Sequence, residues 1–126
     1  MTTIADCQKR QQRGIESVQK WAKDITSSYD NVTVVNMASS WRNGLAFCAI
    51  IHFYRPDLIN YYELSAADVY ENNALAFSIA ESQLGIPALL DAKDMAAMRS
   101  PDRLSIITYV ALLYDYFKDK RMHKYF

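Results

Sequence analysis

The apolar run LAFCAII is the feature that most constrains how this chain folds. It lies inside a longer stretch, WRNGLAFCAIIHFYRP from Trp41 to Pro56, which is apolar on most sides when drawn as a helix. A helix that is hydrophobic all round is buried by neighbours on several faces. Ser39 and Ser40 supply hydroxyl caps for its start, and Pro56 ends it because the residue before a proline avoids the α region. We therefore predict a central, buried helix over residues 41–54.

Three other stretches repeat apolar residues at the three- and four-residue spacing of a helix face. The first covers about residues 13–29. The second starts at Asp68, where Glu71 completes a capping-box arrangement, and it ends at Gly85. The third opens with Pro101 at its first helical position. The expected inward residues are Ile15, Val18, Ala22 and Ile25; Ala74, Phe77, Ala80 and Leu84; and Leu104, Ile107, Val110, Ala111, Tyr114 and Phe117.

The remaining segments read as connectors and short helices. Residues 32–37 are β-branched, but no second strand is present to pair with them, so they indicate an ordered connector. The aromatic connector over residues 57–67 favours a short helical turn around Tyr62, and Asp91 can cap a short helix that runs to Met98. Only three glycines and three prolines are available for turns. We predict an all-α fold of four long helices plus two or three short ones.

Charge and hydropathy exclude several functional classes. The 126 residues carry 14 basic and 14 acidic side chains, so the total charge does not call for nucleic acid. Residues 1–24 hold five basic and three acidic groups and residues 118–126 hold four and one, which leaves five minus ten, or −5, between them. No run approaches the roughly 18 apolar residues of a membrane span, and the first residues lack the apolar core of a signal peptide. A cytoplasmic protein, monomeric and without a cofactor, is expected.

Cys48 and His52 are the strongest candidates for chemistry, because they lie four residues apart on one helix face. Two ligands are too few for a zinc site, which usually takes at least three from the protein. A buried neutral thiol is also a poor nucleophile. We therefore expect no metal site here, with the cysteine packed as a small hydrophobe and the histidine ring held by a hydrogen bond in the core.

Pairs of carboxylates are a second candidate for chemistry, and helix capping explains them better. Asp68 with Glu71, and Asp91 with Asp94, stand at expected helix starts, where negative charge complements the free amide groups and the helix dipole. The three glycines lie far apart, at 14, 44 and 85, so no glycine-rich phosphate loop is present. The sequence therefore predicts a non-enzymatic protein.

Five segments together resemble the calponin-homology domain. They are Trp21 in the first helix, SWRNGLAFCAIIHFYRPDLI from Ser40, ENNALAF from Glu71, LGIPALLDAKDM from Leu84 and PDRLSIITYV from Pro101. The chain looks like the second type of this domain, and VYENNALAF with LGIPALLD favours the group found at the start of MICAL-like proteins. The resemblance implies a domain over residues 13–118, an N-terminal extension over 1–12 and a basic C-terminal tail over 119–126.

The candidate partner surface consists of basic and tyrosine side chains outside the family motifs. Arg13, Lys20 and Lys23 belong to the first helix, where they form either a solvated face or a contact to an acidic surface such as actin or lipid headgroups. Tyr61 and Tyr62 belong to the aromatic connector, where tyrosines either contact a partner or pack the loop onto the core. Both alternatives remain open from the sequence alone.

The resemblance implies a protein-interaction module of a larger actin-linked or membrane-traffic adaptor, with weak or no binding to F-actin by itself. The expected partner is actin or an actin-associated protein. The alternatives are the second domain of a tandem actin-binding pair like those of α-actinin and spectrin, binding to anionic lipid through the basic ends, and an autoinhibitory contact with another segment of the same full-length protein. The expected localisation is cytoplasmic and associated with the cytoskeleton.

Overall fold

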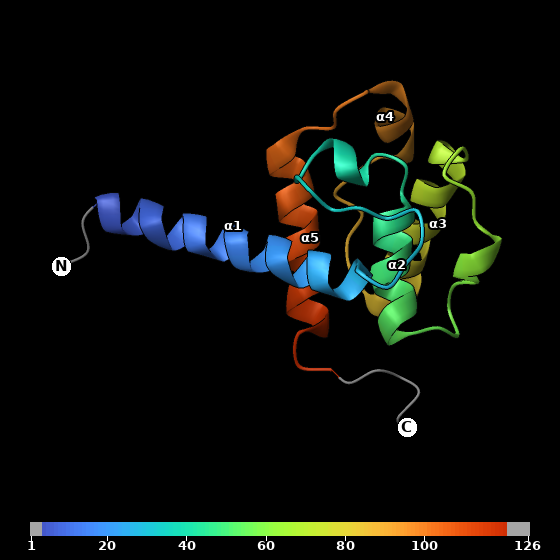
Figure 1. Ribbon diagram of the computed structural model, residues 1–126, viewed down its shortest axis with the longest axis horizontal. Coiled ribbons are helices and arrows are strands. Elements are labelled where there is room, and N and C mark those ends of the chain that lie inside the picture. Colours follow the sequence, from blue (N-terminus) through green and yellow to red (C-terminus); the bar gives the residue numbers. More distant parts are fainter. Residues whose placement is uncertain (1–3, 121–126) are drawn as a thin grey trace.

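Helix α2 (Leu45–Tyr54) is the buried helix of the fold, and helices α1 and α3 pack directly on it (Figure 1). The computed structural model describes the backbone of residues 4–120 and the side chains of residues 13–120. Every side chain of α2 from Leu45 to Ile51 is buried, and so is that of Tyr54. The prediction of a central helix covered on several faces is therefore confirmed. It ends before Pro56, as expected.

Four longer helices and three short ones make up the described part of the chain, which contains no strand. The all-α prediction is therefore confirmed. Helix α1 starts before the expected domain boundary at residue 13. Its first nine residues lie in the expected N-terminal extension of residues 1–12. In chain order the elements are α1 (Ile4–Thr26), η1 (Ser39–Trp41), α2 (Leu45–Tyr54), η2 (Tyr61–Glu63), α3 (Val69–Leu84), α4 (Ala92–Ala97) and α5 (Arg103–Phe117).

Four pairs of helices make most of the contacts between helices in the described part of the chain. Helix α2 packs on α1 and α3, α1 also packs on α5, and α4 packs on α3. The N-terminal part of α1 extends beyond the helical body (Figure 1). Residues 121–126, which hold most of the expected basic tail, lie outside the described residues. Over the described part of the chain, no helix combines the length and apolar character needed to cross a bilayer.

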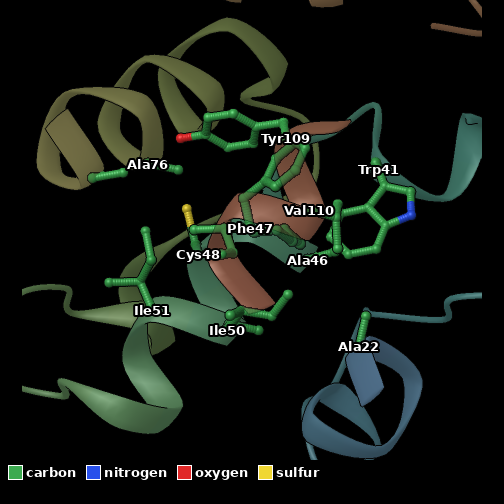
Figure 2. Close-up of a cluster of buried hydrophobic side chains, with 14 of the residues drawn as sticks. Ala22, Trp41, Ala46, Phe47, Cys48, Ile50, Ile51, Ala76, Tyr109 and Val110 are labelled. Atoms are coloured by element: carbon green, nitrogen blue, oxygen red, sulfur yellow. The ribbon is translucent and has the colours of Figure 1, made fainter. Parts of the chain in front are cut away.

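Aromatic rings join the helices at the centre of the core. The Phe47 ring of α2 lies 5.0 Å from that of Trp41, 5.4 Å from that of Phe77 in α3 and 5.5 Å from that of Tyr109 in α5. Figure 2 shows Trp41, Phe47 and Tyr109 gathered with Ala46 and Val110 in one cluster. The contacts of Phe47 with Phe77 and Tyr109 are edge-to-face, a geometry that adds to the free energy gained by burying the rings.

The start of α2 differs from the prediction. The α-helix begins at Leu45 instead of Trp41, because Ser39–Trp41 forms a separate 3-10 turn and Gly44 takes the left-handed conformation with φ +80°. The Ser40 hydroxyl does not cap α2. It accepts a hydrogen bond from the amide of Val35 at 3.1 Å, so it holds the preceding connector.

Gly44 is required at its position by both its backbone angle and its neighbours. A β-carbon there would lie 2.8 Å from the amide nitrogen of Asn73 and 2.8 Å from Cβ of Asn72. Glycine permits this close approach of α2 to α3 because it has no side chain. Gly44 thus admits the backbone of α3 beside the start of α2.

The remaining helix ends match the sequence signals unevenly. Asp91 caps α4 by accepting hydrogen bonds from the amides of Lys93 and Asp94, and Gly85 closes α3 with φ +70°. Asp68 precedes α3 as predicted, yet its side chain accepts no capping hydrogen bond, so the capping-box prediction is wrong. Helix α5 begins at Arg103, two residues after Pro101. The reason is that the Asp102 side chain accepts a hydrogen bond from the Ser105 amide and sets the helix start there.

One residue of the predicted inward faces needs correction. Leu104 is 66% exposed, because it lies in the first turn of α5 beside hollows that no neighbouring side chain fills. Five other predicted inward residues are half-buried: Ile15, Ile25, Ala74, Ala111 and Tyr114. The buried sets of α3 and α5 also include residues that the sequence spacing did not select, because α3 contacts both α2 and α4 and therefore buries more than one face. They are Asn72, Asn73, Ala76, Ile106, Tyr109 and Leu113.

Candidate partner surface

Arg13, Lys20 and Lys23 are all exposed on helix α1. The inward residues Val18 and Ala22 are buried, so the spacing of a helix turns the three basic residues to the opposite side. The structure therefore places these candidates together on one exposed face of α1.

This face carries mixed charge. Lys20 Nζ lies 2.8 Å from Asp24 Oδ2, one helical turn away, with both side chains mostly exposed. The hydrogen bond to Asp24 raises the pKa of Lys20 above its ordinary value. Glu16 is also exposed in the turn before Lys20. The positive potential that α1 presents to an anionic surface is therefore weaker than the count of basic residues indicates.

The two candidate tyrosines have different environments although they are adjacent in η2. Tyr61 is 5% exposed, and its hydroxyl donates a hydrogen bond of 2.8 Å to the carbonyl oxygen of Asp30. Tyr62 is 75% exposed. Tyr61 therefore packs the connector onto the core, and only Tyr62 presents its ring to solvent.

A cluster of rings connects Tyr62 to the core. The Tyr29 hydroxyl and His52 Nδ1 form a 2.8 Å hydrogen bond, and the Tyr29 ring lies 4.8 Å from that of Tyr61. The Tyr62 ring lies 5.5 Å from that of His52 and 5.5 Å from that of Tyr61. Burial raises the pKa of both Tyr29 and Tyr61 to about 12 and lowers the pKa of His52. The hydrogen bond expected for His52 is confirmed.

Cys48 and His52 have separate partners. The Cys48 thiol is fully buried and lies 3.4 Å from the Asn72 carbonyl oxygen, to which it donates. Burial raises the pKa of this thiol to about 12, so it stays protonated and unreactive near neutral pH. Among the residues that the structure describes, no group of three or more His, Cys, Asp or Glu side chains is arranged to hold a metal ion.

Sequence reasoning missed the polar side chains that join the segments around α2. Arg42 donates to the carbonyl oxygen of Met98 at 2.6 Å and to that of Ala96 at 2.8 Å, so it ties the start of α2 to the end of α4. Asn72 and Asn73 are buried, and their amide groups donate to the carbonyl oxygens of Asn43 and Arg42. The only sequence signal was the pair of adjacent asparagines in a helical pattern, where this residue type is unfavourable.

The sequence of this domain is similar to those of known proteins. The calponin homology (CH) domain family matches residues 13–119. Mouse MICAL-like protein 2 is 56% identical over 103 residues, which are 82% of this chain and 10% of the mouse protein. Human MICAL-like protein 1 is 52% identical over 97 residues, or 77% of this chain and 11% of that protein. Human F-actin monooxygenase MICAL2 is 45% identical over 98 residues, or 78% of this chain and 5% of that enzyme.

The chain spans about a tenth of the length of the MICAL-like relatives that it matches. The shared segment is a CH domain, which is a non-catalytic module, and the match to MICAL2 is limited to that domain. The family match covers most of the chain, and the MICAL-like relatives share more than half of the aligned residues. The chain therefore belongs to the calponin-homology family.

Proposed function

We propose that this domain is a non-enzymatic interaction module of an actin-linked or membrane-traffic adaptor, and that it binds F-actin weakly or not at all on its own. The similarity to MICAL-like protein 2 over 82% of the chain is the observation that carries the adaptor role. The name of the related MICAL2 enzyme refers to F-actin, which supports the actin link that we propose. A cytoplasmic, cytoskeleton-associated localisation accords with this role.

The charge pattern of α1 supports weak binding. Actin and anionic lipids both attract a continuous basic surface. Here Asp24 neutralises Lys20 through the 2.8 Å ion pair, and Glu16 adds a further negative charge to the same helix. Exposed charge interactions of this kind are screened at physiological salt, where the Debye length is about 8 Å. Binding through Arg13, Lys20 and Lys23 is therefore weak and sensitive to salt.

Cosedimentation with F-actin at physiological ionic strength tests the proposal. We expect little of the domain in the pellet and no saturation over the accessible concentration range. Asp24→Asn frees the charge of Lys20 and should increase the pelleted fraction at low salt, whereas the double variant Lys20→Glu with Lys23→Glu should lower it. Saturable, tight binding by the unmodified domain at physiological salt would contradict the proposal.

Tyr62 is the tyrosine that we assign to the partner surface, because its ring is 75% exposed while Tyr61 is buried. Tyr62→Ala should weaken binding to an actin-associated partner, and it should lower the melting temperature only slightly because it removes only the ring contacts with His52 and Tyr61. Tyr61→Phe serves as the matched control, since it removes only the buried hydroxyl that donates to Asp30. It should lower stability and leave the partner affinity of the folded domain unchanged. If Tyr61→Phe weakened partner binding and Tyr62→Ala did not, the partner contact would not lie at Tyr62.

A further inference from the structure

Three adjoining hollows cross the surface of α5 and extend from α1 to α4. The largest, about 620 Å³, lies between α1 and α5 over Ile15, Val18 and Leu104. A second hollow of about 210 Å³ shares Leu104 with the first and reaches Leu89. A third of about 110 Å³ shares Leu89 with the second and reaches Met98 at the end of α4. Because each hollow shares lining residues with the next, the three adjoin one another, and together we call them the acidic hollowed surface.

Three large apolar side chains line this surface and are open to solvent. Leu104 is 66% exposed, Leu89 51% and Met98 41%. These three are half of the six large hydrophobic side chains that are exposed in the described part of the chain, the others being Val35, Tyr62 and Tyr70. Scattered exposed hydrophobic residues are normal on protein surfaces, but a contiguous apolar patch with a polar rim marks a binding site.

The charged side chains that line this surface are acidic. Among the described residues, the linings of the three hollows include four aspartates and no lysine or arginine. Asp94 is exposed in the first turn of α4, and Asp115 is exposed on α5, 3.7 Å from the Lys118 ammonium group. The other two, Asp91 and Asp102, cap α4 and α5 and remain exposed. Carboxylates therefore stand at both ends of the surface, beside the first and third hollows, and no described carboxylate lines the middle one.

We propose that the acidic hollowed surface binds a basic amphipathic helix of a partner protein. The apolar face of such a helix presents side chains at i, i+3 or i+4, and i+7, a spacing suited to adjoining hollows. Lysine and arginine residues flanking that face would meet the aspartates of the surface, and charge complementarity of this kind selects the partner and its orientation. This site lies apart from the α1 basic face and Tyr62, so the inference goes beyond the proposed function.

Two other occupants fit less well. A symmetric contact with a second copy of the chain would bring the same patch against itself, with aspartates facing aspartates. A membrane of anionic lipid would be repelled by the same carboxylates. Charge complementarity therefore favours a basic protein segment.

Binding of synthetic helical peptides, measured by fluorescence anisotropy, tests the inference. The probe is an amphipathic peptide of leucine and lysine with its leucines on one face. One control has the same composition in an order that destroys that face, and another has glutamate in place of lysine. We expect both controls to bind at least about tenfold more weakly than the probe. Equal affinity for the probe and the reordered peptide would overturn the proposal.

Variants of the domain locate the binding. Leu104→Gln should weaken binding of the probe by about tenfold or more. Val35→Gln is the matched control, because Val35 is also 66% exposed but lies outside the three hollows, and it should have no effect. Equal losses in both variants would refute the assignment. Amide shifts in heteronuclear NMR spectra should concentrate at Leu89, Met98 and Leu104, and shifts confined to other elements would also refute it.

A second pair of variants tests the aspartates. Asp94→Asn combined with Asp115→Asn should weaken binding and reduce its dependence on salt. Glu63→Gln combined with Glu71→Gln removes two exposed carboxylates outside the hollows. This control should change neither the affinity for the probe nor its dependence on salt. Circular dichroism verifies that all variants fold. Sedimentation equilibrium tests the second copy as occupant: dimerisation that Leu104→Gln abolishes would overturn the proposal, and a monomer at all concentrations would support it.

Discussion

Helix α2 and the acidic hollowed surface have similar apolar side chains in opposite environments. Leu45 is 2% exposed and Ile50 is fully buried, whereas Leu104 is 66% exposed and Leu89 is 51% exposed. Helices α1 and α3 cover α2, and no described side chain fills the hollows beside Leu104. Leucine thus stabilises the fold in one region and remains available for a partner in the other. The comparison shows that apolar character alone does not distinguish a core from a binding site.

The two regions should therefore respond differently to mutation. A change around α2 removes contacts that the folded state already has, so it lowers the free energy of unfolding. A change on the acidic hollowed surface removes contacts that form only with a partner, so it lowers affinity and leaves stability nearly unchanged.

Trp41→Ala should have the largest effect on stability. The Trp41 ring is fully buried 5.0 Å from that of Phe47, and its Nε1–H donates to the Asn36 carbonyl oxygen at 3.0 Å. Truncating a buried tryptophan costs about 3–5 kcal/mol of unfolding free energy. Thermal and urea denaturation measure the loss. The control, Lys20→Glu with Lys23→Glu, changes only exposed side chains and should cost less than about 1 kcal/mol of unfolding free energy. If Trp41→Ala were as stable as the unmodified domain, the region around α2 would not be the stabilising core.

Gly44→Ala should have the second largest effect, a loss of about 2–4 kcal/mol of unfolding free energy. The left-handed backbone alone costs a non-glycine residue about 1–2 kcal/mol, and the clash of the new Cβ with the backbone of Asn73 adds a comparable cost. Gly85→Ala is the matched control, because Gly85 has a similar φ of +70° but no atom within 4 Å of a built Cβ. The difference between the two variants in urea denaturation isolates the cost of the close helix contact. Equal losses would show that only the backbone angle matters at Gly44.

Stability should decline when the pH falls below about 6.5, because of His52. Burial among Tyr29, Tyr61 and Tyr62 lowers the pKa of this histidine from 6.5, so the unfolded chain takes up the proton first. The contribution is fully present above pH 6.5 and is lost as the pH falls through the lower pKa of the folded state. Urea midpoints measured between pH 7 and pH 5 check this. His52→Gln should flatten the dependence, and an unchanged slope would contradict the assignment.

Leu104→Gln should have the smallest effect on stability, within about 0.5 kcal/mol, because exposed substitutions rarely exceed this. Its melting temperature should equal that of Val35→Gln. This result would sharpen the comparison, since the same variant is expected to weaken binding of the amphipathic probe. A loss of several kcal/mol would instead place Leu104 in the core, as its position in the sequence pattern indicated.

The sequence predicted the helices better than their starts and faces. The apolar run inside α2 identified a buried helix, because a helix that is covered on all sides has apolar residues at nearly every position. Its start could not be predicted, since it depends on the left-handed conformation of Gly44, where the backbone of Asn73, from a helix far along the chain, leaves no room for a side chain. Leu104 fitted the helical spacing of α5, but periodicity does not report whether a neighbour covers that position.

The candidate site shows the same division. Adjacent tyrosines have identical chemistry, so the sequence left open whether Tyr61 and Tyr62 pack or project. The structure separates them because the carbonyl of Asp30 lies within reach of one hydroxyl only. Likewise, the count of basic residues on α1 indicated a positive surface, but the 2.8 Å pairing of Lys20 with Asp24 depends on side-chain geometry.

The sequence by itself determined the family, the all-helical class and the buried centre at α2, because these depend on local periodicity and on motifs that are continuous in the chain. Only the tertiary structure decided which apolar and charged side chains remain exposed, and which of them lie together. Leu89, Met98 and Leu104 come from different segments, and they line adjoining hollows only because α5 lies beside α1 at one end and beside the α4 segment at the other. A binding surface is a property of neighbours in space, which a linear pattern does not encode.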